Sequence, residues 1–248
     1  MITIAVYNLK GGVGKTAAAV NLAWLSANEG RRTLLWDLDS QGSASFYFHS
    51  KPKYKIPPKK VAQEYGLTGF LKKTDFGNLT ILPADFANPR IDAIAQQMHK
   101  SPQAIRKALK EVSGETDLVW IDAPGGFTPL TANLLAAADW ILVPLIPTVL
   151  SLRSYSNVVR YVRQRKLETR RIIPFFSLVD LRKSIHSATI KEFVFPGSKF
   201  TRAYIPYASD VERMGVRRAP LVSYSRSSTS AMAYTALWKE IVRRTKLK

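Results

Sequence analysis

The stretch Tyr7-Asn8-Leu9-Lys10-Gly11-Gly12-Val13-Gly14-Lys15-Thr16 follows an apolar run and precedes an alanine-rich segment, which is the order strand, loop, helix. Its spacing Gly11-x-x-Gly14-Lys15-Thr16 closes a P-loop, in which glycines let backbone N–H groups curl around a phosphate. Lys15 can then reach the β- and γ-phosphates, and the Thr16 hydroxyl can ligate Mg²⁺. The helix that begins near Lys15 directs its positive end at the same anion. The predicted phosphate-binding residues are Gly11, Gly12, Val13, Gly14, Lys15, Thr16 and Ala17.

Two further apolar runs end in carboxylates. Residues 33–36 lead into Asp37, with Asp39 two residues further on, and residues 118–121 lead into Asp122. The carboxyl ends of parallel strands line the ligand crevice of an open sheet, so these acids are expected to face the nucleotide. Asp122 would hold the hydration shell of Mg²⁺ against the phosphates. Thr16, Asp37 and Asp122 are therefore the predicted metal site.

Strand-like and helix-like segments alternate along most of the chain. Further strands are expected at 79–83, 140–144 and 172–179. Helices are expected at 17–28, within 91–110 with a break near Ser101-Pro102, at 132–138, from 152 onward, and at 231–244. This alternation predicts an α/β P-loop NTPase with a mostly parallel twisted sheet covered by helices on both faces. The length of 248 residues suits one domain spanning 1–248. Residues 49–65, rich in lysine and containing three prolines, are predicted to form an exposed basic loop.

Composition restricts the setting in which the protein works. The chain has no cysteine, which excludes disulfides and Cys-ligated zinc or iron–sulfur sites and suits a reducing cytoplasm. The N-terminus lacks a signal-peptide pattern, and no apolar run approaches the roughly 20 residues of a membrane span. A cytoplasmic protein is expected.

Positive charge is concentrated in the second half of the chain. Residues 1–150 hold 16 basic and 12 acidic residues, a net +4, whereas residues 151–248 hold 21 and 6, a net +15. Solubility alone needs a net charge of only about 2 to 8. The asymmetry therefore indicates a polyanionic partner, with nucleic acid favoured over an anionic membrane.

The loop Lys10-Gly-Gly-Val-Gly-Lys15-Thr16 resembles the deviant Walker A motif of the ParA/MinD family of ATPases. The resemblance extends from Ile2 to about Val242. It includes the Asp37-Leu38-Asp39 segment, although Ser40 stands where the family usually has proline, and Asp180-Leu181-Arg182.

The resemblance implies roles for individual residues and an assembly. Lys10 would reach the nucleotide of a partner subunit, although a solvated loop lysine is the alternative for this residue. Asp39 would position the attacking water, which makes Lys10, Lys15 and Asp39 the catalytic set. Residues 200–206 resemble the last strand of the family, and the loop from Pro206 would cradle adenine. The ATP-bound form would be a sandwich homodimer. ATP with Mg²⁺ is favoured over GTP because no Asn/Thr-Lys-x-Asp signature occurs.

Arginines gather in several parts of the basic half. On the helix from Leu152, Arg153, Arg160, Arg163 and Arg170 are placed on one stripe, which is either a solvated face or a phosphate-binding face. Arg213, Arg217 and Arg218 follow each other closely further on. The residues predicted to bind DNA are Arg160, Arg163, Arg170, Arg202, Arg213, Arg217 and Arg218.

These expectations describe a ParA-like ATPase, cytoplasmic and associated with the nucleoid. It would bind nonspecific double-stranded DNA as an ATP homodimer, position or segregate a plasmid, chromosome or large protein assembly, and be stimulated by a separate adaptor protein. The alternative is a MinD-like, membrane-associated ATPase that uses the tail 237–244 as an amphipathic anchor, although core packing of that tail is favoured. A metabolic P-loop kinase or ligase is a third possibility.

Overall fold

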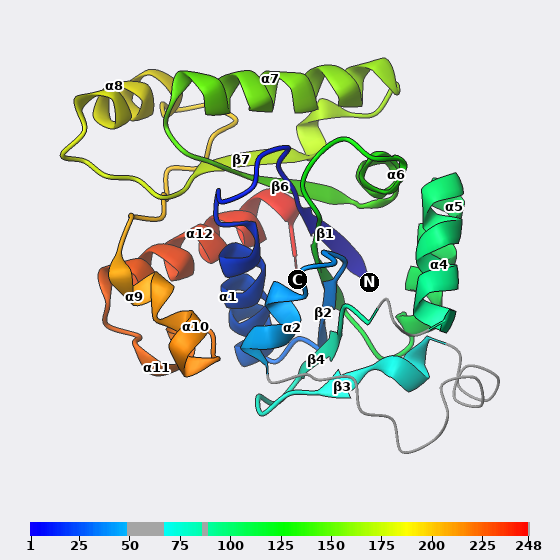
Figure 1. Cartoon of the computed structure of the whole chain (residues 1–248). Helices are drawn as coiled ribbons and strands as arrows, with labels where there is room; N and C mark the ends of the chain where they lie inside the picture. The colour runs from blue at the N-terminus through cyan, green and yellow to red at the C-terminus, as the bar shows by residue number, and fades with distance from the viewer. Residues whose placement is uncertain (49–66, 86–88, 248) are drawn as a thin grey trace.

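The computed structural model describes residues 1–48, 67–85 and 89–247 (Figure 1). The basic segment 49–65, predicted as an exposed loop, lies outside the described residues. No helix in the described part of the chain is long and apolar enough to cross a membrane.

A seven-stranded sheet in the order β3-β4-β2-β5-β1-β6-β7 forms the centre of the described structure. Its strands are β1 (Ile2–Val6), β2 (Thr33–Asp37), β3 (Lys72–Lys73), β4 (Leu79–Leu82), β5 (Leu118–Asp122), β6 (Trp140–Leu145) and β7 (Ile172–Phe176). The two-residue edge strand β3 is antiparallel to β4, and the other pairs are parallel. The predicted α/β fold with a mostly parallel sheet is confirmed.

Helices cover both faces of this sheet (Figure 1). They are α1 (Lys15–Asn28), α2 (Ser43–Tyr47), η1 (Thr68–Phe70), α4 (Pro89–Lys100), α5 (Pro102–Val112), α6 (Pro129–Ala137), α7 (Val149–Gln164), η2 (Thr169–Arg171), α8 (Ser184–Phe193), α9 (Ser209–Glu212), α10 (Met214–Arg217), α11 (Leu221–Tyr224) and α12 (Thr229–Thr245). One core cluster joins a sheet face to α1, α10, α11 and α12, and the other joins the opposite face to α4, α5, α6 and α7.

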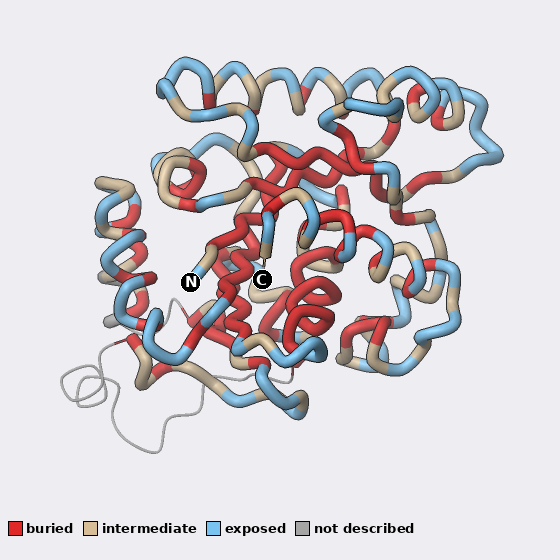
Figure 2. Tube along the Cα trace, turned by 180° about the vertical axis from the view of Figure 1, so that it is seen from behind, coloured by how far each residue is buried: buried red, intermediate tan, exposed pale blue. Residues whose placement is uncertain are grey.

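The central strands are buried on both faces, as a parallel sheet between helix layers requires (Figure 2). On β5 the indole of Trp120 packs against Trp238 of α12, with ring centroids 6.1 Å apart, and its N–H donates to the Ser26 hydroxyl of α1 at 3.2 Å. Helix α1 is buried along most of its length. The phosphate loop that precedes it is therefore fixed between a buried strand and a buried helix.

The prediction that Arg170 continues the arginine stripe of the helix is wrong. Helix α7 ends at Gln164, and Lys166 turns into the left-handed region with φ 55°. The Lys166 N–H donates to the Arg163 carbonyl, and the Leu167 N–H donates to the Val162 carbonyl, which together form a Schellman motif. Arg170 lies beyond this stop, in η2. The sequence did not signal it because lysine, and not glycine, occupies the left-handed position.

No regular strand forms at 200–206, although the N–H groups of Thr201 and Ile205 donate to the Pro174 and Phe176 carbonyls of β7 at 3.0 and 2.9 Å, and Pro206 forms a bridge with Val179. The N–H groups of Arg202 and Ala203 donate instead to the Glu240 carboxylate of α12, at 2.9 and 3.3 Å. A side chain thus satisfies the backbone groups that a neighbouring strand would otherwise bind.

Candidate nucleotide-binding site

The loop between β1 and α1 has the backbone shape that a P-loop requires. Gly12 and Gly14 have φ of 69° and 87°, a region in which residues with a Cβ are strained. A Cβ on Gly14 would also lie 2.8 Å from the Ser177 hydroxyl oxygen, which follows β7. Gly14 is in addition the N-cap of α1, so the loop's N–H groups and the positive end of the helix face one place.

The two lysines of the loop differ in exposure. Lys15 is 8% exposed, and its ammonium donates to the Lys10 carbonyl at 3.2 Å. Lys10 is exposed to solvent. Lys15 therefore belongs to the phosphate loop of its own chain, whereas the Lys10 side chain is accessible from outside it.

Asn8 organises the start of the loop and was not singled out from the sequence. It is fully buried, and its amide donates to the Pro144 carbonyl of β6 at 2.6 Å. Its carbonyl oxygen accepts from the Lys10 N–H at 3.1 Å and from the Ser154 hydroxyl of α7 at 2.9 Å. Its place directly after the strand and before the glycines was the available signal. Asn8 ties the loop to β6 and α7 together.

Asp37 and Asp122 are register partners at the carboxyl ends of the neighbouring strands β2 and β5. Asp37 is 1% exposed and accepts hydrogen bonds from the Ser45 N–H and hydroxyl of α2, at 2.8 and 2.7 Å. Burial raises its pKa to about 6, against the lowering effect of these hydrogen bonds. Ser45, which sequence reasoning missed, holds this carboxylate in place.

The Asp122 carboxylate is fully buried, and among the described residues neither oxygen has a partner in hydrogen-bond geometry, although the Thr16 hydroxyl lies close enough to act on its charge. Burial, and then the nearby Asp37 charge, raise its pKa to about 7, while the Thr16 hydroxyl and the Lys15 ammonium oppose the rise. A buried carboxylate with no partner is costly unless a cation or a proton completes it. The donor set of Thr16, Asp37 and Asp122 therefore fits a hard divalent cation such as Mg²⁺.

Asp39 follows Asp37 by two residues and is partly exposed at the same edge of the sheet. Its carboxylate accepts from the Gln41 N–H at 3.0 Å, and its carbonyl accepts from the Gly42 N–H at 2.9 Å. Asp39 is thus held in a tight turn that leads into α2.

The loop after β5 is attached to the end of β1. The buried Tyr7 hydroxyl donates to the Gly126 carbonyl at 2.9 Å, and the Thr131 hydroxyl donates to the same oxygen at 2.9 Å. A Cβ on Gly125 would lie 3.7 Å from the Lys15 ammonium. The segment that follows Asp122 therefore borders the phosphate loop directly.

Pro206, predicted at the adenine, reaches the same edge of the sheet. It bridges Val179, and the next residue, Tyr207, donates its N–H to the Val179 carbonyl at 2.8 Å. Val179 follows Ser177, the residue that Gly14 approaches. The fold thus brings Pro206 to the side of the site occupied by β7.

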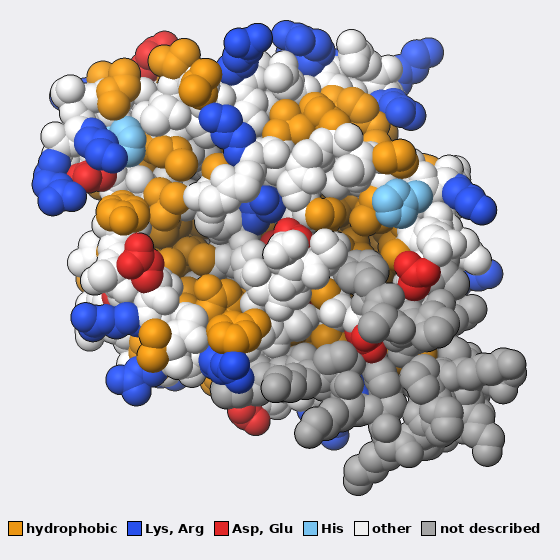
Figure 3. Space-filling view, viewed as in Figure 1, with side chains coloured by type: hydrophobic (Ala, Val, Ile, Leu, Met, Phe, Trp, Pro, Cys, Tyr) orange, Lys and Arg blue, Asp and Glu red, His pale blue; other side chains and the backbone are white. Residues whose placement is uncertain are grey.

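The arginines predicted to bind DNA do not form one cluster. Arg160 and Arg163 are exposed on α7, whereas Arg213, Arg217 and Arg218 belong to the α9–α10 segment on another side of the molecule (Figure 1). Arg202, which lies between these two groups in the sequence, is also exposed. Lysine and arginine side chains accordingly appear in separate groups in Figure 3, along α7 and around α8 to α10.

A P-loop whose lysine lies beside two buried carboxylates, at the carboxyl edge of a parallel sheet, defines a P-loop nucleoside triphosphatase. Comparison with known proteins agrees. The model of the AAA domain family matches residues 1–174. The chromosome-partitioning ATPase Soj of Treponema pallidum (strain Nichols) is 29% identical over 249 residues, which cover 98% of this chain and 97% of Soj.

Solved structures show the same architecture. The septum site-determining protein MinD of Pyrococcus horikoshii OT3, complexed with Mg-ADP, superposes with a TM-score of 0.77 at 21% identity and covers 97% of this chain and 95% of its own. Cobyrinic acid a,c-diamide synthase of Mycobacterium smegmatis, with a bound ATP analogue and magnesium, gives a TM-score of 0.77 at 26% identity, with 100% and 96% covered. The chain belongs to the AAA domain family and to the ParA/MinD family of P-loop ATPases.

Proposed function

We propose that this protein is a ParA-like ATPase that forms a homodimer with ATP and Mg²⁺, binds nonspecific double-stranded DNA in that state, and positions or segregates a cargo. A separate adaptor protein stimulates hydrolysis and so releases the dimer from DNA. The protein acts in the cytoplasm, on the nucleoid. The observation that carries the proposal is the buried and unpartnered Asp122 carboxylate beside Lys15, in a loop that also offers an exposed Lys10.

The residues of the site divide the work of hydrolysis. The P-loop amides and Lys15 bind phosphate oxygens. When phosphate is bound, the Lys15 ammonium contacts it in place of the Lys10 carbonyl. Thr16, Asp37 and Asp122 hold Mg²⁺, which supplies positive charge against the phosphates when bound. The Asp39 N–H donates to the Asp37 carboxylate at 3.2 Å, while its own partly exposed carboxylate orients the attacking water. Lys10 adds a positive charge to the nucleotide of the partner subunit.

Homodimerisation through the nucleotide edge is supported by what this edge presents to solvent. Helix α7 begins shortly after β6 ends, and its first residues Val149 and Leu150 are 69% and 62% exposed. Two adjacent exposed apolar side chains at this edge suit contact with a second copy. The exposed Lys10 lies at the same edge of the sheet.

Nonspecific DNA binding is supported by the net charge of +15 on residues 151–248. Phosphate contacts release counterions, so affinity falls with salt by a log–log slope of about −0.9 per phosphate neutralised. A dimer doubles the basic surface applied to one DNA molecule. ATP therefore strengthens binding without any base recognition.

A membrane anchor at residues 237–244 is disfavoured by their packing. Leu237, Trp238 and Ile241 are 0%, 1% and 0% exposed, because the apolar face of α12 packs on α1 and the sheet. An interfacial anchor needs an apolar face that is available to lipid. This helix uses its apolar face in the core.

A metabolic role is the second candidate, because the synthase from Mycobacterium smegmatis is similar over the whole chain. Such an enzyme turns over ATP only when its small-molecule substrate is present. Slow turnover with ATP alone, raised by DNA or by an adaptor protein, excludes that candidate.

The central test uses Asp39→Ala with ATP and Mg²⁺. Removing only the water-positioning carboxylate leaves nucleotide binding intact, so the variant accumulates as an ATP dimer bound to DNA, whereas Lys15→Ala loses nucleotide binding. Asp75→Ala, an exposed acid far along the chain from the P-loop, is the matched control and behaves as wild type. Filter binding on two unrelated duplexes across a salt series measures the effect.

Three results contradict the proposal. They are normal hydrolysis by Asp39→Ala, strong preference for one duplex, and affinity that does not change with salt.

A further inference from the structure

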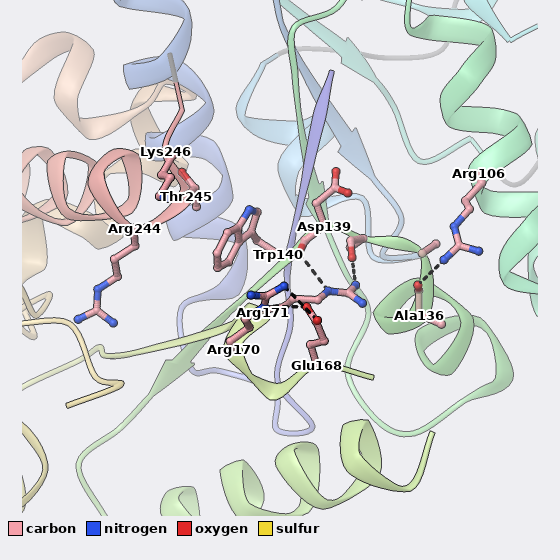
Figure 4. A pocket seen from close by; sticks show the side chains of 12 residues that line it. Arg106, Ala136, Asp139, Trp140, Glu168, Arg170, Arg171, Arg244, Thr245 and Lys246 are labelled. Carbon is pink, nitrogen blue, oxygen red and sulfur yellow. Dashed lines mark hydrogen bonds and ion pairs between the residues drawn. The ribbon is translucent and has the colours of Figure 1, made fainter. Parts of the chain in front are cut away.

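A basic groove crosses the amino-terminal edge of the sheet, opposite the edge that carries the P-loop. Trp140 and Ile172, the first residues of β6 and β7, lie on its floor. A cavity of about 490 Å³ is bounded by α5, by the turn after α6, by η2 and by the end of α12 (Figure 4). A second cavity of about 370 Å³ shares Trp140, Arg170 and Arg244 with the first, so the two form one groove.

The side chains that line this groove are predominantly cationic. Five basic and two acidic residues line the first cavity, and the second adds Lys199 without an acid; among these cations, Arg244 is ion-paired with Glu240 of α12 at 2.7 Å. The basic residues are Arg106, Arg170, Arg171, Lys199, Arg244 and Lys246. They come from segments far apart in the sequence, so the charge cluster exists only in the folded chain.

Two of the arginines are held by the carboxyl end of α6. Arg106 donates to the Ala136 carbonyl at 2.9 Å, and Arg171 donates to the Leu135 carbonyl at 3.2 Å and the Asp139 carbonyl at 3.0 Å. The two positive guanidinium groups interact favourably with the negative carboxyl end of the α6 dipole. The same hydrogen bonds also fix the two guanidinium groups at the groove wall, as Figure 4 shows, which lowers the entropy lost when a ligand binds.

Arg170 is the readily exchanged member of the cluster. It forms two hydrogen bonds with Glu168, at 2.8 and 3.0 Å, and the two side chains are 79% and 58% exposed. An exposed pair of this kind contributes little to stability, so a phosphate can replace the Glu168 carboxylate at small cost.

We propose that this groove binds the phosphodiester backbone of DNA as a second contact site, remote from the nucleotide. The proposal rests on the proposed function, because DNA is the ligand of both. An enclosed small-molecule pocket is mainly apolar with a few polar groups, whereas this groove is open and dominated by arginine. Many weak phosphate contacts along an open basic groove are the pattern of sequence-independent nucleic-acid binding.

The location makes this contact independent of ATP. The groove is complete within one chain, and it lies at the opposite end of the strands from the edge that would meet a partner subunit. Nucleotide-free protein therefore keeps a weak, salt-sensitive affinity for DNA. The ATP dimer adds to that affinity but does not create it.

The test reverses two exposed charges of the groove, in the double variant Arg170→Glu, Lys199→Glu. Neither side chain closes a buried contact, and thermal denaturation verifies that the variant is folded. Lys107→Glu, Lys110→Glu is the matched control, because both lysines are exposed on α5, neither lines the groove, and the net charge changes equally. Binding to a short duplex is measured across a salt series, with an ATP analogue and Mg²⁺ and without nucleotide.

The groove variant is expected to flatten the log–log salt slope by about 2 in both states and to remove the nucleotide-free binding, while ATP affinity is unchanged. Equal losses in the groove variant and the control overturn the inference but leave the proposed function intact. Absence of DNA binding by the wild-type protein in the presence of ATP defeats the proposed function itself.

Discussion

At the scale of single residues, the site is marked by groups whose local environment is unfavourable without a ligand. The Asp122 carboxylate is buried without a hydrogen-bond partner among the described residues, next to the Asp37 carboxylate. Both groups have raised pKa values, to about 7 and about 6. The folded chain therefore holds protons that the unfolded chain has already lost, which is a stability cost that a bound cation relieves.

Replacing Asp122 by Asn should raise the melting temperature of the ligand-free protein at pH 8. The folded-state pKa of Asp122, about 7, exceeds the ordinary value, so wild-type stability falls as pH rises from about 4 to about 7, and the neutral amide avoids that loss. The gain should shrink at pH 5, where Asp122 is protonated. Thermal denaturation at both pH values, with and without ATP and Mg²⁺, measures the effect. In the Asp122→Asn variant, ATP and Mg²⁺ should no longer raise the melting temperature.

The control for this prediction has the opposite sign. Asp117 is ion-paired with Arg32 at 2.6 Å, which lowers its pKa to about 2, so its contribution is present above about pH 4 and disappears in acid. Asp117→Asn should therefore lose a little stability at pH 8. An Asp122→Asn variant that is less stable than wild type at pH 8 would show that Asp122 is satisfied without a ligand.

At the scale of elements, the short helix α2 connects the acidic end of β2 to the basic C-terminal segment. Ser45 binds Asp37, and its hydroxyl oxygen accepts from the Ala84 N–H at 3.0 Å. The next residue, Phe46, lies beneath the Arg218 guanidinium, which is 4.1 Å from the ring centroid. In turn, α10 is fixed to α1 by the contact between Asn21 and the Met214 sulfur, at 3.3 Å. The contact between Phe46 and Arg218 thus links α2 to the end of α10.

Phe46→Leu should destabilise the protein by about 0.5 to 1 kcal/mol, the value of an exposed cation–π contact. The ring is 46% exposed, so the change leaves no buried cavity. Phe46→Tyr keeps the aromatic face and should match wild type. Urea denaturation followed by circular dichroism compares the three proteins, and equal stability of the Leu and Tyr variants would mean that the Arg218 contact contributes nothing.

At the scale of the whole molecule, the two ends of the sheet have different chemistry. The carboxyl edge carries the P-loop, the buried carboxylates and the exposed apolar start of α7, whereas the amino edge carries the arginine groove. In the proposed homodimer, a partner subunit bound at the first edge would leave the second edge of each chain open.

Lys10→Ala should separate nucleotide binding from assembly. Lys15 remains in the loop, so ATP still binds, but the dimer loses a cation that neutralises the partner's phosphates. We expect loss of ATP-dependent dimerisation, or of hydrolysis, in size-exclusion chromatography and turnover assays with ATP. Lys73→Ala, an exposed lysine on the edge strand β3, should behave as wild type. An unchanged dimer with unchanged turnover would return Lys10 to the role of a solvated loop lysine.

The sequence by itself determined the phosphate loop, the alternation of the main strands and helices, and the carboxylates at the strand ends. These features depend on local patterns: glycines that must adopt positive φ, apolar runs that must be buried, and acids that follow them directly. The alternation of strand and helix then leaves few arrangements for a parallel sheet. Asp37, Asp39 and Asp122 could therefore be placed at one edge before any coordinates were known.

Only the tertiary structure decided which distant groups meet. Contacts across 30 or more residues of chain join Asn8 with Pro144 and Ser154, Glu240 with the amides of residues 202 and 203, and Arg106 with Ala136. The grouping of arginines differs from the sequence-based expectation because a Schellman turn at Lys166, formed without glycine, moves Arg170 off α7. A buried polar group needs a hydrogen-bond partner, but the residues around it in the sequence do not show which distant residue that partner is. Such contacts therefore depend on how the helices and strands pack together.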